Sequence, residues 1–376
     1  MRVSVGALLL SCVAQVGVAQ QNQTGLGWSV LPGIGYDSDE GLGYSVDGGL
    51  YQYDDGTRLP YRWALEPSVY VTSKGRVSIT AFYDVPRAFG ERVRVSARAN
   101  LDRDCCQPFY GLGNASLNDT TLPTRYYTYR RNRVTAAVSV QVNLLPHLRV
   151  LSGIAADRGT AAARDSATLF AQDATGETRT SLGPKLGLVY DTRDLERDPH
   201  RGVWIEGVAW QGLVMEGGEF TRITATLRGY LSPYARLTFA ARLFGEHVRG
   251  DMPLALLADL GSSFQDFTGV GGAESVRGVL RQRFLGRTRM LTNLEIRLRG
   301  PGFRLFDAPW QLGAVGFVDA GRVWDDRGLG DGSAGLHWGK GLGLRIAWGA
   351  SFIVGADFGH GSEAGTQTYL RLGHLF

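Results

Sequence analysis

The residues that most often catalyse reactions or bind metals are few in this chain and do not cluster along it. Of its six histidines, His200, His247 and His337 fall on separate segments without the spacing of a metal site. Cys105 and Cys106 are adjacent, and their redox state stays open because a disulfide between neighbouring residues is strained. No Gly-x-Ser-x-Gly elbow or phosphate-binding loop occurs. The sequence therefore predicts no enzyme, no cofactor and no metal site.

A different chemistry, charge pairing, is concentrated in residues 269–287, GVGGAESVRGVLRQRFLGR. Gly271 and Gly272 precede the tripeptide Val276-Arg277-Gly278, and nothing in the stretch alternates like a strand. A guanidinium can bind a carboxylate through two parallel hydrogen bonds, which makes such a pair geometrically specific. We expect this loop to fold inward and to place Arg277 on an acidic side chain.

Three more arginines follow in the same loop: Arg281, Arg283 and Arg287. For these we expect the role of an ordinary extracellular loop, in which arginines contact the phosphates of lipopolysaccharide. The same role is the alternative for Arg277.

The segments around this loop alternate between polar and apolar residues. In 135–144 one face holds Thr135, Ser139 and Gln141, while the other is wholly apolar. The arginines of 92–99 and 222–231 also fall on one face of their segments. Segments of about ten residues with an arginine-rich face are longer than most strands of soluble sandwiches and suit a membrane barrel. No apolar run in the mature chain approaches the length of a membrane helix, so a membrane protein of this kind must be a closed barrel.

The fold class predicted is all-β, a transmembrane antiparallel β-barrel of about 16 strands with a long loop folded into the lumen. Its strands are expected near 42–53, 61–72, 76–84, 91–100, 122–131, 133–144, 148–157, 182–191, 202–212, 219–231, 235–247, 289–299, 311–324, 335–348, 352–360 and 367–376. With both termini in the periplasm, the turn at 191–201 is periplasmic and the connection 248–288 is extracellular.

The N-terminal residues resemble an export signal, with Arg2 followed by an apolar stretch and small residues near Ala19. A lipoprotein box ending at Cys12 is the alternative. The domain organisation expected is a signal peptide at 1–19, a short periplasmic segment at 20–41 and an outer-membrane barrel at 42–376.

Strand parity assigns acidic side chains to the lumen. In 316–324, Phe317, Asp319 and Gly321 share a face, and the opposite face is small and apolar. Asp319 is therefore the leading partner for Arg277. By the same parity Glu295, Asp357 and Arg345 face inward as secondary partners, and glycines on the last strands leave room for the loop.

The segment YDTRDLERDPHRG, residues 190–202, is a turn between two expected strands. Asp191, Arg193 and Asp194 can pair locally there, and Pro199 with Gly202 can close the turn.

These motifs together resemble the barrel of the BamA/TamA-type outer-membrane assembly factors, also called bacterial surface antigens. The resemblance rests on Val276-Arg277-Gly278 after two glycines, FVDAG at 317–321, the 190–202 turn and FYGLGN at 109–114, and it covers essentially the whole mature chain. It implies that the loop arginine, Arg277, pairs with Asp319 inside the lumen. It also implies a weak seam between the first and last strands.

The sequence departs from that family in three places. Segment 20–41 is too short for the periplasmic polypeptide-transport-associated domains that usually precede the barrel, and Val279 stands where an aromatic residue is usual. Phe376 ends the chain as a barrel targeting signal should, but His374 replaces an apolar residue.

The resemblance implies insertion or translocation of proteins at the bacterial outer membrane. A passive pore or structural surface antigen is the alternative. Expected partners are outer-membrane lipid and lipopolysaccharide, polypeptide substrates and a separate periplasmic protein. The net charge of +4 is spread along the chain, which argues against nucleic acid.

Overall fold

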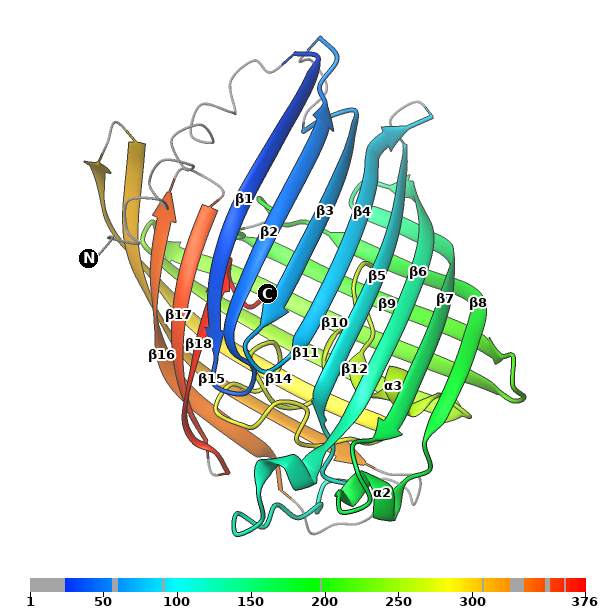
Figure 1. Cartoon of the computed structure of the whole chain (residues 1–376). Helices are drawn as coiled ribbons and strands as arrows, with labels where there is room; N and C mark the ends of the chain where they lie inside the picture. The colour runs from blue at the N-terminus through cyan, green and yellow to red at the C-terminus, as the bar shows by residue number, and fades with distance from the viewer. Residues whose placement is uncertain are drawn as a thin grey trace, which may run out of the picture.

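In a computed structural model, the chain forms a closed antiparallel β-barrel (Figure 1). The structure describes residues 24–55, 60–89, 92–196, 198–305, 308–324, 335–348, 352–361 and 363–376. The expected signal peptide and Cys12 lie outside these residues. Within them no helix has the length and apolar character of a membrane span.

Sixteen strands close the barrel, in the order β1-β18-β17-β16-β15-β14-β11-β10-β9-β8-β7-β6-β5-β4-β3-β2, which confirms the predicted fold class and strand number for the part of the chain described. Their bounds are β1 Leu26–Asp37, β2 Gly41–Gln52, β3 Trp63–Thr72, β4 Arg76–Ala88, β5 Val93–Pro108, β6 Thr128–Leu145, β7 Leu148–Ala163, β8 Glu177–Asp191, β9 Gly202–Val214, β10 Glu219–Tyr234, β11 Leu237–Gly250, β14 Thr288–Leu305, β15 Ala308–Trp324, β16 His337–Trp348, β17 Phe352–Gly361 and β18 Gly365–Leu372. Short elements lie between them: η1 Thr124–Tyr127, α2 Leu169–Asp173, α3 Leu254–Leu257, β12 Asp259–Leu260 and β13 Phe267–Thr268.

The predicted strand number is right, although one strand was missed and another was divided into two. The barrel begins with β1 at Leu26, inside the segment 20–41 that was expected to precede it. The segments 122–131 and 133–144, expected as two strands, form the single strand β6 after the 3₁₀ helix η1. The two errors offset each other, so the strands from β7 onward keep the predicted parity.

Burial along the strands is inverted relative to a soluble protein. On β14 the polar side chains of Asn293 and Glu295 are fully buried, while Leu294 is 54% and Ile296 47% exposed. An apolar outer face and a polar interior are the pattern of a barrel whose solvent is lipid.

The two ends of the barrel carry different connections. β1 begins and β18 ends at the end of the barrel with the two-residue turns 146–147 and 235–236. The connections 109–127, 164–176 and 251–287 lie at the opposite end. Short periplasmic turns and long extracellular loops are typical of outer-membrane barrels, so this distribution favours the expected orientation.

The barrel closes weakly between β1 and β18. The register of this contact contains one pair, Asp37 with Tyr369, supplemented by hydrogen bonds between Ser38 and Thr368. Every other neighbouring pair of strands is joined over most of its length. We call the β1–β18 contact the seam.

Candidate functional site

Residues 251–287, which we call the long loop, contact strands on all sides of the barrel. Polar contacts reach side chains on β5, β6, β8, β9, β10, β11, β14, β15, β17 and β18, namely Asp104, Arg131, Lys185, Glu206, Arg222, Glu246, Glu295, Asp319, Asp357 and Tyr369. A segment outside the barrel could not touch opposite walls at once. We infer that the long loop occupies the interior.

Arg277 of the long loop is fully buried against three carboxylates from three strands. Its Nε and Nη2 donate to the two oxygens of Asp319 on β15, at 2.7 and 3.0 Å. Its Nη1 lies 2.8 Å from Glu295 on β14 and 3.1 Å from Asp357 on β17. The guanidinium carbon also lies 3.5 Å from the ring centre of Phe317. These five residues form the Arg277 cluster.

The cluster is held together by charge. Burial alone would lower the pKa of Arg277, but Asp319 and the other two carboxylates raise it above its usual value, so the guanidinium is always charged. Removing one partner of a buried ion pair leaves the other charge without compensation, which costs about 3–5 kcal/mol. The Asp319 contact has the two-pronged geometry that gives such pairs their specificity.

Additional arginines complete the network. Arg345 donates to Asp357 at 2.6 Å, and Arg297 donates to Glu295 at 2.9 Å. Arg371 of β18 lies 3.4 Å from Asp357. The predicted secondary partners Glu295, Asp357 and Arg345 are therefore all in one network, which Arg297 and Arg371 extend.

Glycines make the close approach of the loop possible. Gly278 has a φ of 90°, and a Cβ there would lie 2.7 Å from the carbonyl carbon of His360. Across the contact, a Cβ on Gly359 would lie 2.8 Å from the Gly278 nitrogen. Side chains at either position would force the loop away from the wall.

A small apolar contact anchors the same turn. Val270, Val276, Val279, Phe284 and Val323 pack together and are buried. On the wall, a Cβ on Gly321 would lie 2.9 Å from both Val270 and Val276. Gly321 thus leaves room for these valines. In the loop itself, Gly271 and Gly272 have φ values of 108° and 98°, which favour glycine.

The long loop also contacts both sides of the seam. The Gly278 amide donates to the Tyr369 hydroxyl on β18, at 3.1 Å. On the other side, the Arg281 amide donates to Asp39 in the turn after β1, at 2.9 Å, and its side chain lies 2.9 Å from Glu40.

The expectation that Arg281 and Arg283 contact lipopolysaccharide is wrong. They are 6% and 3% exposed, and their side chains pair with Asp104 and Glu363 respectively. Arg287 is half-buried and donates to the Gly250 carbonyl. Asp104 is buried on β5 and Glu363 is half-buried in the turn between β17 and β18, and these acids pair with arginines that are themselves buried.

Sequence reasoning missed a second charged contact of the long loop. Asp259 lies 3.1 Å from Arg131 and 2.6 Å from Arg133, and Asp266 lies 3.3 Å from Arg133 and 3.2 Å from Arg222. The shared parity of Arg131 and Arg133 was the available signal. Dividing β6 at Asn132 hid it.

The 190–202 turn brings its predicted residues together. Arg193 binds Asp191 through two hydrogen bonds, of 2.9 and 3.1 Å. Asp194 accepts hydrogen bonds from the backbone of His200 and Arg201, which follow Pro199. Gly202 then begins β9 with a φ of 102°.

The end of the chain leaves the barrel wall. β18 ends at Leu372 instead of continuing to Phe376, and Gly373 has a φ of 79°. Arg297 donates to the Phe376 carbonyl, at 2.9 Å, and the Phe376 ring packs on Arg242 and Tyr230. His374 lies 3.2 Å from Asp198 in the turn before β9. Whether Phe376 serves in targeting stays a prediction.

Cys105 and Cys106 form a disulfide at the end of β5. No group of three or more potential metal ligands occurs among the residues that the structure describes.

Known structures share the architecture. BamA from Haemophilus ducreyi lacking POTRA domains 1–3 superposes with a TM-score of 0.57 at 11% identity, over 98% of this chain and 78% of that one. CdiB from Escherichia coli gives a TM-score of 0.59 at 12% identity, over 96% and 70% of the two chains. CdiB from Acinetobacter baumannii gives 0.57 at 15%, over 94% and 61%. At these identities the likeness concerns the fold alone.

No curated protein sequence is similar enough to match the chain. The Omp85 superfamily domain, in contrast, matches residues 67–359, from β3 to β17. The chain therefore belongs to the Omp85 superfamily, a family of non-enzymatic outer-membrane barrels that insert or translocate proteins.

Proposed function

We propose that this barrel inserts or translocates polypeptides at its seam, and that the long loop holds the seam closed between events. The single observation that carries the proposal is the asymmetry of closure. β1 and β18 share one register pair, whereas each pairs along its whole length with its other neighbour, β2 or β17, so most backbone groups on the two facing edges are left for another strand.

An unpaired strand edge is a template for pairing with an incoming chain. β1 is twelve residues long and β18 eight, each close to the length that crosses a membrane. A client strand could therefore pair with either edge without leaving the lipid.

The contacts of the long loop supply the closing element. Gly278 and Arg281 lie three positions apart on the same turn. The Gly278 amide binds Tyr369 of β18, and the Arg281 amide binds Asp39 in the turn after β1. Arg277 fixes that turn to the wall. Release of the turn would remove its hydrogen bonds on both sides of the seam together.

A passive pore is the other function that the sequence left open. The buried long loop and its ion pairs occupy the space that a wide pore would need, which favours a transporter held closed. The separate periplasmic partner protein expected from the sequence stays a prediction.

A disulfide across the seam tests the proposal. The Ser38→Cys and Thr368→Cys variant links two residues that already form hydrogen bonds with each other across the seam. In proteoliposomes, the oxidised variant should lose insertion of an unfolded eight-stranded outer-membrane barrel, measured by protease protection, and a reductant should restore it.

The matched control is Val138→Cys with Ile154→Cys, a directly paired and outward-facing couple on β6 and β7. This disulfide should leave insertion unchanged. Because the control also contains Cys105 and Cys106, it shows whether reduction of their disulfide affects insertion. Wild-type insertion by the oxidised seam variant would refute the proposal.

A further inference from the structure

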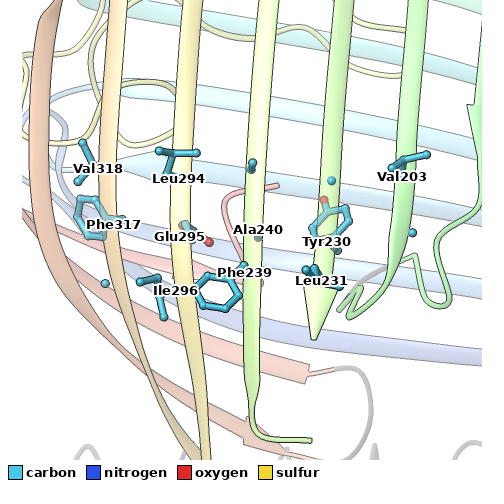
Figure 2. A pocket seen from close by; sticks show the side chains of 14 residues that line it. Val203, Tyr230, Leu231, Phe239, Ala240, Leu294, Glu295, Ile296, Phe317 and Val318 are labelled. Atoms are coloured by element: carbon cyan, nitrogen blue, oxygen red, sulfur yellow. The ribbon is translucent and has the colours of Figure 1, made fainter. Parts of the chain in front are cut away.

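The outer face of the barrel contains a hollow away from the seam. A cavity of about 650 Å³ opens across β9, β10, β11, β14 and β15 (Figure 2). Its walls include the apolar side chains of Val203, Leu231, Phe239, Leu294, Ile296 and Val318. Five of these are between 43% and 62% exposed, which places them on the face away from the lumen. We call this cavity the wall groove.

The groove exists because small residues interrupt a row of large ones. Gly229 pairs with Val203 on one side and with Ala241 on the other, and Ala241 pairs in turn with Leu294. A Cβ on Gly229 would meet nothing within 4 Å. In the adjacent row, Ile296 pairs with Gly316. The missing side chains leave a channel between rows of leucine, phenylalanine and isoleucine.

The groove runs toward the end of the barrel where β1 begins and β18 ends. Leu231 pairs with Phe239, and the two-residue turn 235–236 follows a few residues beyond them. At about 3.3 Å per residue, Phe239 lies roughly 10 Å from Arg236. One end of the groove thus lies close to the turn 235–236, at the short-turn end of the barrel.

Two exposed cations stand at that end. Arg201 is exposed and directly precedes β9, whose first residue, Gly202, pairs with Tyr230 beside Leu231. Arg236 is exposed in the turn between β10 and β11. Among the described residues, no ion pair joins either guanidinium to a carboxylate. Exposed positive charge therefore lies at the same end of the barrel as the end of the apolar groove.

We propose that the wall groove binds one phospholipid, with an acyl chain in the channel over Gly229 and the phosphate at Arg201 and Arg236. Hydrocarbon is the solvent of this face in the outer membrane, so the apolar occupant is a lipid tail. The volume lies within the ~300–1,000 Å³ typical of small-ligand sites. Arginine is well suited to a phosphate group.

Native mass spectrometry of the whole purified protein in detergent tests this proposal, with phosphatidylglycerol as the probe. Wild type should retain one lipid. Gly229→Leu fills the groove and should weaken retention about tenfold, because a leucine side chain replaces several buried methylene groups of the lipid tail. Arg201→Ala with Arg236→Ala should weaken it about fivefold.

The control is Gly245→Leu, on the same outer face, where a Cβ also meets nothing within 4 Å but which does not line the groove. It should retain the lipid like wild type. Heat-modifiable migration on gels should show all variants folded.

The proposal would be overturned by equal retention in Gly229→Leu and wild type, by equal loss in Gly245→Leu, or by equal binding of diacylglycerol, which has no phosphate. Displacement of phosphatidylglycerol by lipid A would also overturn it, because the site would then take the lipid of the opposite leaflet.

Discussion

The seam and the β14–β15 contact are two ways of joining neighbouring strands in one barrel. β14 and β15 pair from Thr288 with Trp324 to Leu305 with Ala308, whereas β1 and β18 share only Asp37 with Tyr369. A long ladder satisfies its backbone groups locally. The seam has few hydrogen bonds of its own, and the long loop, far away in the sequence, adds one to Tyr369 and one to Asp39.

The acids that pair with the long loop stand in two different parts of the barrel. The acids that hold Arg277 stand on β14, β15 and β17, while those that hold Arg281 stand near the beginning of the chain, at Glu40 and Asp104. The long loop therefore connects the well-paired wall to the weakly paired edge. Breaking its attachment to the wall should cost most, and changes at the seam should cost less.

The largest effect is expected for Arg277→Ala. Three buried carboxylates would lose their common partner, so we expect a loss of stability of about 3–5 kcal/mol. Less heat-modifiable folded barrel should appear on gels, and the folded remainder should conduct more in planar bilayers. Asp319→Ala should act in the same direction.

Exchange of the two charges, Arg277→Asp with Asp319→Arg, should restore part of the folded fraction. If both single variants fold as well as wild type, the Arg277 cluster does not support the barrel.

A smaller effect is expected at the seam itself. Tyr369→Phe removes the acceptor of the Gly278 amide and leaves a buried N–H group unpaired, at a cost of about 1–3 kcal/mol. Urea titration should detect this loss of stability. In the Ser38→Cys and Thr368→Cys background, the disulfide across the seam should also form faster.

Tyr230→Phe is the matched control, because the hydroxyl of Tyr230 is buried without a hydrogen-bond partner among the described residues. An equal loss in both variants would mean that the Gly278 contact contributes nothing specific.

The smallest effect concerns pH. Burial, followed by the charge of Asp37, raises the pKa of Asp39 to about 7. Because its pKa is higher in the folded than in the unfolded protein, the resulting stability is present at low pH and is lost as pH rises toward and through 7. The melting temperature of wild type should therefore fall between pH 5.5 and 8, by an amount on the order of 2 °C.

Asp39→Asn keeps an acceptor for the Arg281 amide but cannot ionise, so this part of the decrease should disappear. An unchanged pH dependence in the variant would assign the decrease to other groups.

Much of the wall could be predicted from the sequence. The inward parity of Glu295, Asp319 and Asp357 follows from the two-residue period of a strand, which any ten residues display by themselves. The glycines around Arg277 could also be recognised in the sequence. The barrel fold and the joining of Arg277 to these acids rest on such local patterns, whereas the strand number was right only because two errors offset each other.

Other features were decided only by the tertiary structure. β1 is rich in glycine and pairs with its sequence neighbour β2 and with the last strand, so its role depends on a contact with the far end of the chain. The partners of Arg281 and Asp259, the inward turn of Phe376 and the wall groove likewise depend on register between strands. Register is a property of neighbours in space, and a single strand carries no record of what lies beside it.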